Sequence, residues 1–166
     1  GTEVVIAVSD IKPSDTSVVV EKDSLYFDTL ALSLKKIPTV QHMYTVGKKS
    51  IGKWAKLFIA VKIVESGNDG DNSIYARRDF NLTGMRQPKS RKTLSLGRTK
   101  SNYATFAYWY DCMVDFGMYL NGMERGFKKK FHKTPSNRDM VLYMFGKYNC
   151  HPVWRDRVLY SLKNSK

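Results

Sequence analysis

Residues 51–65 read IGKWAKLFIAVKIVE, and they alternate more cleanly than the rest of the first half of the chain. Leu57, Ile59 and Val61 fall on one face and Phe58 on the other, and β-branched residues dominate the end of the stretch. A period of two is typical of a β-strand. The stretch therefore predicts one long strand.

The segments on either side extend this pattern. Before it, three runs predict further strands, with a short helix from Asp28 as the alternative for the last run: Glu3–Val8, Ser17–Glu21 and Ser24–Leu34. After it, GNDGDN (67–72) predicts a turn, because Asp-Gly and Asn tolerate positive φ. We then expect a return strand over Ile74–Leu82 and an extended loop over residues 84–100.

The periodicity becomes helical at Ser101. Apolar residues recur at helical spacing over residues 103–120, and Ser101 or Asn102 can accept a hydrogen bond as the cap. Gly122 and Gly126 are the expected ends. This stretch predicts the first helix of the chain.

Two shorter helices are predicted after it, over residues 134–145 and 153–162. Gly146 ends the first, and Pro152 fits the first turn of the second. Strands first and helices second predict an α+β fold. We expect an N-terminal, mainly antiparallel β-sheet followed by a C-terminal helical half, in a single domain of residues 1–166.

The excess of positive charge lies entirely in the second half of the chain. Residues 1–75 have nine Lys/Arg and nine Asp/Glu, whereas residues 76–166 have nineteen and six, which accounts for the net charge of +13. The chain thus divides into a neutral β-rich half (1–75), a basic loop (76–100) and a helical basic half (101–166). Such a one-sided charge attracts polyanions.

Eight cations with a single acid, Asp79, lie within residues 76–103. Cations on a flexible loop can follow a phosphate backbone and release its counterions, and arginine suits bidentate contact with phosphate oxygens. A solvated loop whose charge only maintains solubility is the alternative. With the three lysines of residues 128–130, the predicted anion-binding residues are Arg77, Arg78, Arg86, Lys89, Arg91, Lys92, Arg98, Lys100, Lys128, Lys129 and Lys130.

Phe127 and Phe131 flank the run of three lysines. Aromatic rings beside cations can stack on single-stranded nucleic acid, or they can reach the acyl boundary of an anionic membrane. At a spacing of i and i+4 they can also simply face the core from the end of a helix. The sequence leaves these three roles open.

The last two predicted helices have the outline of a helix-turn-helix motif. The connection between them, residues 146–151, is longer than the tight turn that this motif prefers. Two packed core helices are therefore the preferred interpretation, and sequence-specific DNA binding is a minor alternative.

No catalytic or metal-binding motif stands out in the sequence. Cys112 and Cys150 lack the close spacing of a zinc site. Asp111 and Asp115 would raise the pKa of a nearby Cys112 thiol, which is the wrong direction for a nucleophile. We therefore expect no enzyme activity, no cofactor and no metal.

These observations predict a non-enzymatic, basic binding or assembly protein that engages RNA or a ribonucleoprotein through its phosphates. Viral coat, nucleocapsid and matrix proteins are of this type. The main alternative is a peripheral, matrix-type protein on an anionic membrane surface, and the second is a helix-turn-helix DNA-binding protein. The predicted helix over residues 103–120 is rich in aromatic residues, which protein interfaces favour, so a homo-oligomer is a second expectation for this helix. We expect an intracellular location, in the cytoplasm or nucleus, with a virion or a peripheral membrane site as alternatives.

Overall fold

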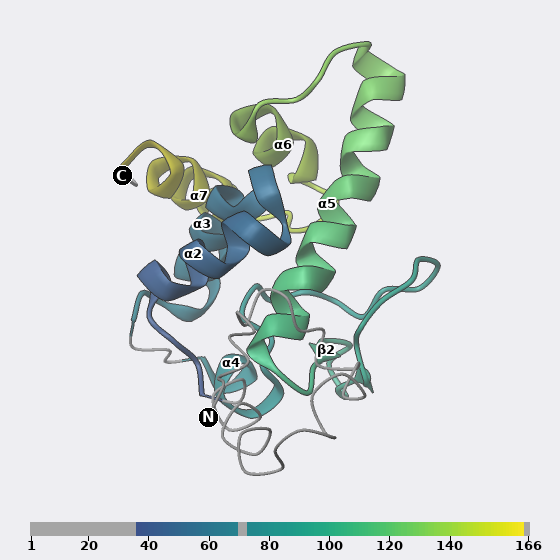
Figure 1. Ribbon diagram of the computed structural model, residues 1–166. Helices are drawn as coiled ribbons and strands as arrows, with labels where there is room; N and C mark the ends of the chain where they lie inside the picture. Colours follow the sequence, from purple (N-terminus) through teal and green to yellow (C-terminus); the bar gives the residue numbers. More distant parts are fainter. Residues whose placement is uncertain (1–35, 70–72, 165–166) are drawn as a thin grey trace, which may run out of the picture.

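A computed structural model describes residues 36–69 and 73–164 of the chain, and this part is built mainly from helices (Figure 1). In chain order the elements are α2 (Val40–Ser50), the 3₁₀ turn η2 (Gly52–Trp54), α3 (Ala55–Ser66), α4 (Ile74–Asp79), β1 (Gly97–Arg98), β2 (Ala104–Thr105), α5 (Trp109–Phe131), α6 (Asn137–Met144) and α7 (Pro152–Asn164). The expected α+β fold with an N-terminal sheet is wrong. The strands predicted over Glu3–Val8, Ser17–Glu21 and Ser24–Leu34 lie outside the described residues.

The stretch that predicted a long strand forms η2 and the buried helix α3. Leu57, Phe58 and Val61 are fully buried although they point in different directions around the helix. Apolar residues on every side satisfy both the alternating pattern of a strand and the pattern of a buried helix. Burial on all sides therefore explains why the period of two was misleading.

Lys62 is a buried charge near the end of α3. Its ammonium group donates hydrogen bonds to the carbonyl oxygens of Gly67, at 2.8 Å, and of Asn68. Cations at a helix C-terminus satisfy carbonyl groups that the helix leaves unpaired. Lys62 therefore fixes the turn that follows α3.

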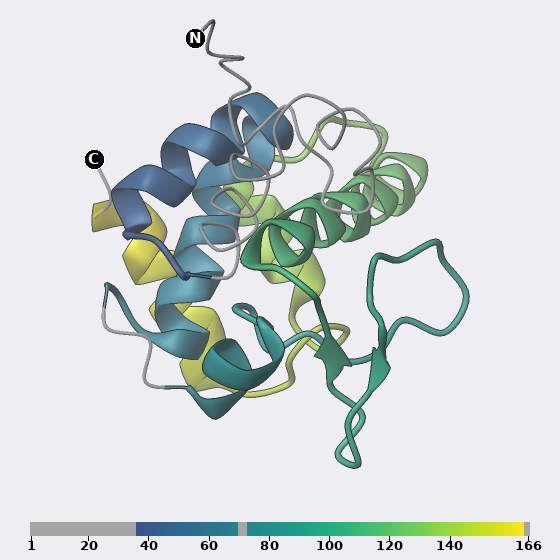
Figure 2. The ribbon, with the colours of Figure 1, turned by 60° about the horizontal axis from the view of Figure 1, so that its bottom comes forward.

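The predicted return strand is a short helix, α4, that ends in a left-handed residue, Phe80 (φ 52°). The sheet of the described residues consists of β1 and β2, two residues each, paired antiparallel. The segment between α4 and α5 projects from the helices as a loop and a narrow hairpin (Figure 2). The expectation of an extended, irregular connection over residues 84–100 is close to what the structure shows.

Helix α5 begins at Trp109, later than predicted, because residues 101–105 belong to the hairpin. It also continues past Gly122 and Gly126 to Phe131. A Cβ at Gly126 would lie 2.9 Å from the hydroxyl oxygen of Tyr143. This glycine is therefore explained by close helix packing, not by a helix end.

The two C-terminal helices are confirmed. Ser136 and Asp139 form a reciprocal capping box at the start of α6. Gly146 follows α6 with φ of 90°, and Pro152 is the first residue of α7. Trp154 of α7 packs into the core. None of the described helices has both the length and the hydrophobicity needed to span a membrane.

Candidate active site

Glu65 is the acidic residue of α3 and lies in its last turn. Burial raises the pKa of its carboxyl group to about 7. Hydrogen bonding from the side chains of Trp154 and Asn149 and the positive charge of Arg86 lower that pKa, and burial outweighs them. Glu65 can therefore hold or release a proton near neutral pH.

Gly84 lies directly against the Glu65 carboxyl group. A Cβ at this position would stand 2.5 Å from Oε2 of Glu65, and Gly84 has φ of 64°. Both the space and the left-handed backbone require glycine here. The close approach of the backbone removes water from one side of the carboxyl group.

Asn81 shapes the turn that carries Gly84. Its buried side-chain amide donates to the carbonyl oxygens of Met85 and Ala104, both at 2.9 Å, and its Oδ1 accepts from the Met85 N–H at 3.0 Å. Ser66 ties the same turn to α3 by donating to the carbonyl oxygen of Leu82 at 2.9 Å. The turn is thus fixed to the end of the helix that carries Glu65.

Replacing Gly84 by alanine should destabilise the protein more than the same change at Gly52. Both glycines have positive φ, 64° and 58°, but a Cβ at Gly52 meets nothing within 4 Å. The difference isolates the contact with Glu65, and we expect about 1–2 kcal/mol more loss for Gly84→Ala. Urea unfolding of the two variants measures it. Equal losses would show that Glu65 does not fill the space over Gly84.

A cavity of about 330 Å³ is lined by residues of the loop after Gly84, the middle of α5 and the connection after α6, and Glu65 is not one of its lining residues. Arg86 and Tyr148 line it, and both interact electrostatically with Glu65. Burial, followed by the Glu65 charge, raises the pKa of Tyr148, which donates its hydroxyl proton to the Thr83 carbonyl oxygen. Tyr148 therefore acts as a neutral wall and not as a base.

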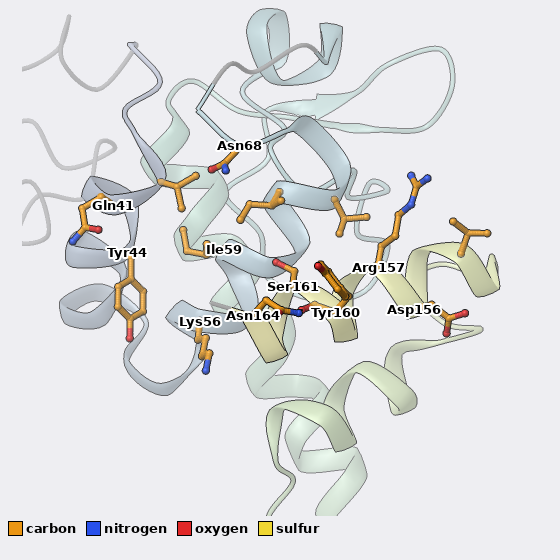
Figure 3. A pocket seen from close by; sticks show the side chains of 14 residues that line it. Gln41, Tyr44, Lys56, Ile59, Asn68, Asp156, Arg157, Tyr160, Ser161 and Asn164 are labelled. Atoms are coloured by element: carbon orange, nitrogen blue, oxygen red, sulfur yellow. The ribbon is translucent and has the colours of Figure 1, made fainter. Parts of the chain in front are cut away.

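A larger cavity, about 840 Å³, lies between α2, α3 and α7. Figure 3 shows Ile59 of α3 and Tyr160 and Ser161 of α7 around it. Among its lining residues the carboxylate is Asp156, which is exposed and pairs with Arg155 at 2.9 Å. Neither cavity has a buried acid among its lining residues, and the smaller one is the candidate site because Arg86 and Tyr148, which line it, interact electrostatically with Glu65.

Cys112 is not a nucleophile. Burial raises the pKa of its thiol to about 12, and the charge of Asp115 contributes in the same direction. Asp111, one turn before Asp115, has its pKa raised to about 6 by burial and then by Asp115. Among the described residues no group of three His, Cys, Asp or Glu side chains is placed to hold a metal ion.

The structure separates the cations that the sequence grouped together. Arg86, Lys89 and Arg91 come together at the smaller cavity. Arg78 pairs with Asp79 at 2.8 Å. Arg77, Lys92, Arg98 and Lys100 are exposed on α4, the loop and the hairpin and do not line either cavity.

Lys128, Lys129 and Lys130 lie at the far end of α5 (Figure 1). Asp115, which binds Arg91, precedes Lys128 by thirteen residues, or about 20 Å along a helix. Phe127 is buried and contacts Phe131, with ring centroids 4.6 Å apart. The predicted anion-binding residues therefore do not form one continuous surface.

The sequence analysis missed Glu65. The signal was present, because Glu65 is the only acid in the stretch of residues 51–65 and stands two residues before the Gly-rich turn of residues 67–72. With that stretch interpreted as a strand, nothing indicated that its end meets Trp154 and Gly84. These residues follow far along the chain, and folding alone brings them together.

No family model matches the sequence, and no curated protein matches it. Among solved structures, the chain is similar to the catalytic domain of the autolysin Auto from Listeria monocytogenes. The two are 14% identical, with a TM-score of 0.49, over 84% of this chain and 92% of that domain.

These findings correct the function predicted from sequence. The predicted cations are dispersed over the described residues, and the partly buried Glu65 has a raised pKa. The expectation of a non-enzymatic RNA-binding protein is therefore wrong, together with its membrane-binding and helix-turn-helix alternatives. The expected partners and location stay predictions.

Proposed function

We propose that the protein is a hydrolase in which Glu65 is the general acid for cleavage of a glycosidic bond. The observation that carries this proposal is the partly buried Glu65, whose pKa is raised to about 7. A carboxylic acid that stays protonated near neutral pH beside a tryptophan is suited to protonate a glycosidic oxygen. We place the substrate in the cavity that Arg86 and Tyr148 line.

The reaction requires that Glu65 give up a proton and regain it. The proton passes from the carboxyl group to the leaving oxygen as the bond from this oxygen to the anomeric carbon breaks. Water then adds to the anomeric carbon, and the Glu65 carboxylate takes the proton that this water loses. Each cycle consumes one water and restores the acid.

Trp154 and Asn149 favour the ionised form that appears during this cycle. The indole Nε1 of Trp154 is buried and has no partner in normal hydrogen-bonding geometry among the described residues. A buried donor without a partner is costly, so it favours a negative charge formed next to it. These two side chains therefore keep the pKa of Glu65 from rising further.

No second carboxylate is among the groups that shift the pKa of Glu65. Asp115 binds Arg91, Asp79 binds Arg78, and Asp69 accepts a hydrogen bond from the Val40 N–H. The pair of facing carboxylates used by many glycoside hydrolases is thus not formed by these residues. Glu65 serves as both acid and base in the proposed cycle.

The pH dependence of hydrolysis tests the proposal. The acid must be protonated to act, so kcat/KM should fall about tenfold per pH unit above pH 7. We suggest measuring reducing ends released from chitin oligomers, a neutral glucan, a polyuronide and bacterial cell walls between pH 5 and 9. Absence of cleavage of all four polymers, or a rate that rises through pH 7, would contradict the role of Glu65.

A further inference from the structure

The cavity that Arg86 and Tyr148 line has a one-sided charge. Residues from three places meet there: the loop after Gly84, the middle of α5 and the connection after α6. All of its charged lining residues are cations, namely Arg86, Lys89, Arg91 and Lys147. The rest of its walls is formed by Met85, Pro88, Ser90, Tyr119, Gly122, Met123 and Tyr148. A cavity with less polar walls and charges of one sign concentrates the field on its interior.

Three of these four cations are available to a ligand. Arg91 is neutralised, because its guanidinium group binds the buried Asp115 at 2.7 Å. No described carboxylate lies within ion-pairing distance of Arg86, Lys89 or Lys147. The positive charge is therefore not balanced within the described part of the chain.

Arg86 is held in place without a carboxylate. Its guanidinium group lies 4.2 Å from the ring centroid of Tyr103, and it donates to the Ser101 carbonyl oxygen at 2.7 Å. These contacts use one edge and one face of the group, so other N–H donors remain. A planar guanidinium group held in this way is suited to bind a carboxylate with two hydrogen bonds.

We propose that this cavity is a subsite for an acidic sugar unit, whose carboxylate binds Arg86 with Lys89 and Lys147 around it. A volume of about 330 Å³ is at the lower end of the range for ligand pockets and suits one sugar ring. Tyr119 and Tyr148 give that ring apolar walls. The assignment rests on the proposed hydrolase function and adds the substrate class: a glycan that contains an acidic sugar unit.

Binding to the full chain tests the subsite without relying on turnover. Glucuronate and its methyl ester differ in charge and share the ring, so NMR titration of the Arg86 side-chain Nε–H compares them at one site. We expect the ester to bind about tenfold or more weakly. Affinity for glucuronate should fall by a similar factor, about tenfold, in the double variant Arg86→Gln, Lys147→Gln, where isothermal titration calorimetry replaces the Arg86 signal as the measurement. Rising ionic strength should also weaken it.

The double variant Arg98→Gln, Lys100→Gln is the matched control. It removes the same amount of charge from the neighbouring hairpin but from outside the cavity. Equal affinity for glucuronate and its ester, or equal loss in both double variants, would overturn the subsite. Sulfate bound as tightly as glucuronate at Arg86 would overturn the sugar assignment. Failure to cleave any polymer while glucuronate binding persists would contradict the hydrolase function alone.

Discussion

Replacing Glu65 by glutamine should abolish hydrolysis and make the protein more stable at alkaline pH. Glutamine keeps the shape of the side chain and has no proton to give, so we expect kcat to fall by about 10²–10⁴. Reducing-end assays at pH 6 on the best of the four polymers measure this loss. Glu124→Gln is the matched control, because Glu124 lies on α5 and pairs with Lys53.

The same variant has a readout that needs no substrate. The pKa of Glu65 is about 7 in the folded chain, against an ordinary value of 4.5 for this carboxyl group. Between these values the folded state binds more protons than the unfolded state, so the free energy of unfolding falls as pH rises. The contribution of one such group is up to about 3 kcal/mol, complete above pH 7. In the Glu65→Gln variant the free energy of unfolding should not show this decrease with rising pH.

Urea unfolding at pH 5 and pH 8 measures the difference for wild type, Glu65→Gln and Glu124→Gln. The wild type and Glu124→Gln should lose more stability over this interval than Glu65→Gln. Parallel curves for all three proteins would mean that Glu65 is ionised at pH 5 like an ordinary carboxylate. Its role as a general acid near neutral pH would then fail.

The local signals in the second half of the chain were sufficient to find helices. Ser136 and Pro152 mark helix starts by their own chemistry, and α6 and α7 begin where these residues predict. Gly122 and Gly126 were misleading as helix ends, and at Gly126 the reason is that a glycine also lets another element approach. Tyr143 packs against Gly126, a contact that only the folded chain reveals.

The main error came from α3. Leu57, Phe58 and Val61 are buried against different neighbours, and a helix surrounded by protein has no polar face to show its period. The short hairpin of β1 and β2 and the helix α4 also lacked a periodic pattern long enough to identify them. The fold class therefore depended on an ambiguous stretch.

The site was harder to predict than the helices. Glu65, Gly84, Arg86 and Trp154 come from α3, from the loop after α4 and from α7, and no local spacing relates them. Charge counting did identify Arg86, Lys89 and Arg91, which meet at one cavity. It missed Lys147, and it could not separate these residues from cations that stand elsewhere on the surface.

Replacing Asp115 by asparagine should cause the largest loss of stability. The Asp115 side chain is fully buried and accepts hydrogen bonds from Arg91 at 2.7 Å and 3.2 Å, from the Thr93 hydroxyl at 2.7 Å and from the Leu94 N–H at 2.8 Å. Loss of one partner from a buried ion pair leaves the other charge unpaired, which costs about 3–5 kcal/mol. Urea unfolding at pH 7 measures this.

Asp156→Asn is the control, because Asp156 also pairs with an arginine but is exposed on the surface. The stability of this variant should stay near that of the wild type. Thr93→Val tests the same cluster more gently by removing one hydrogen bond to the charge, with an expected loss of about 1.5–3 kcal/mol. Asp115 anchors the loop that brings Lys89 and Arg91 to the cavity. If Asp115→Asn and Thr93→Val both unfold like the wild type, the hydrogen bonds to Asp115 do not hold that loop. The cation-lined cavity then loses its physical basis.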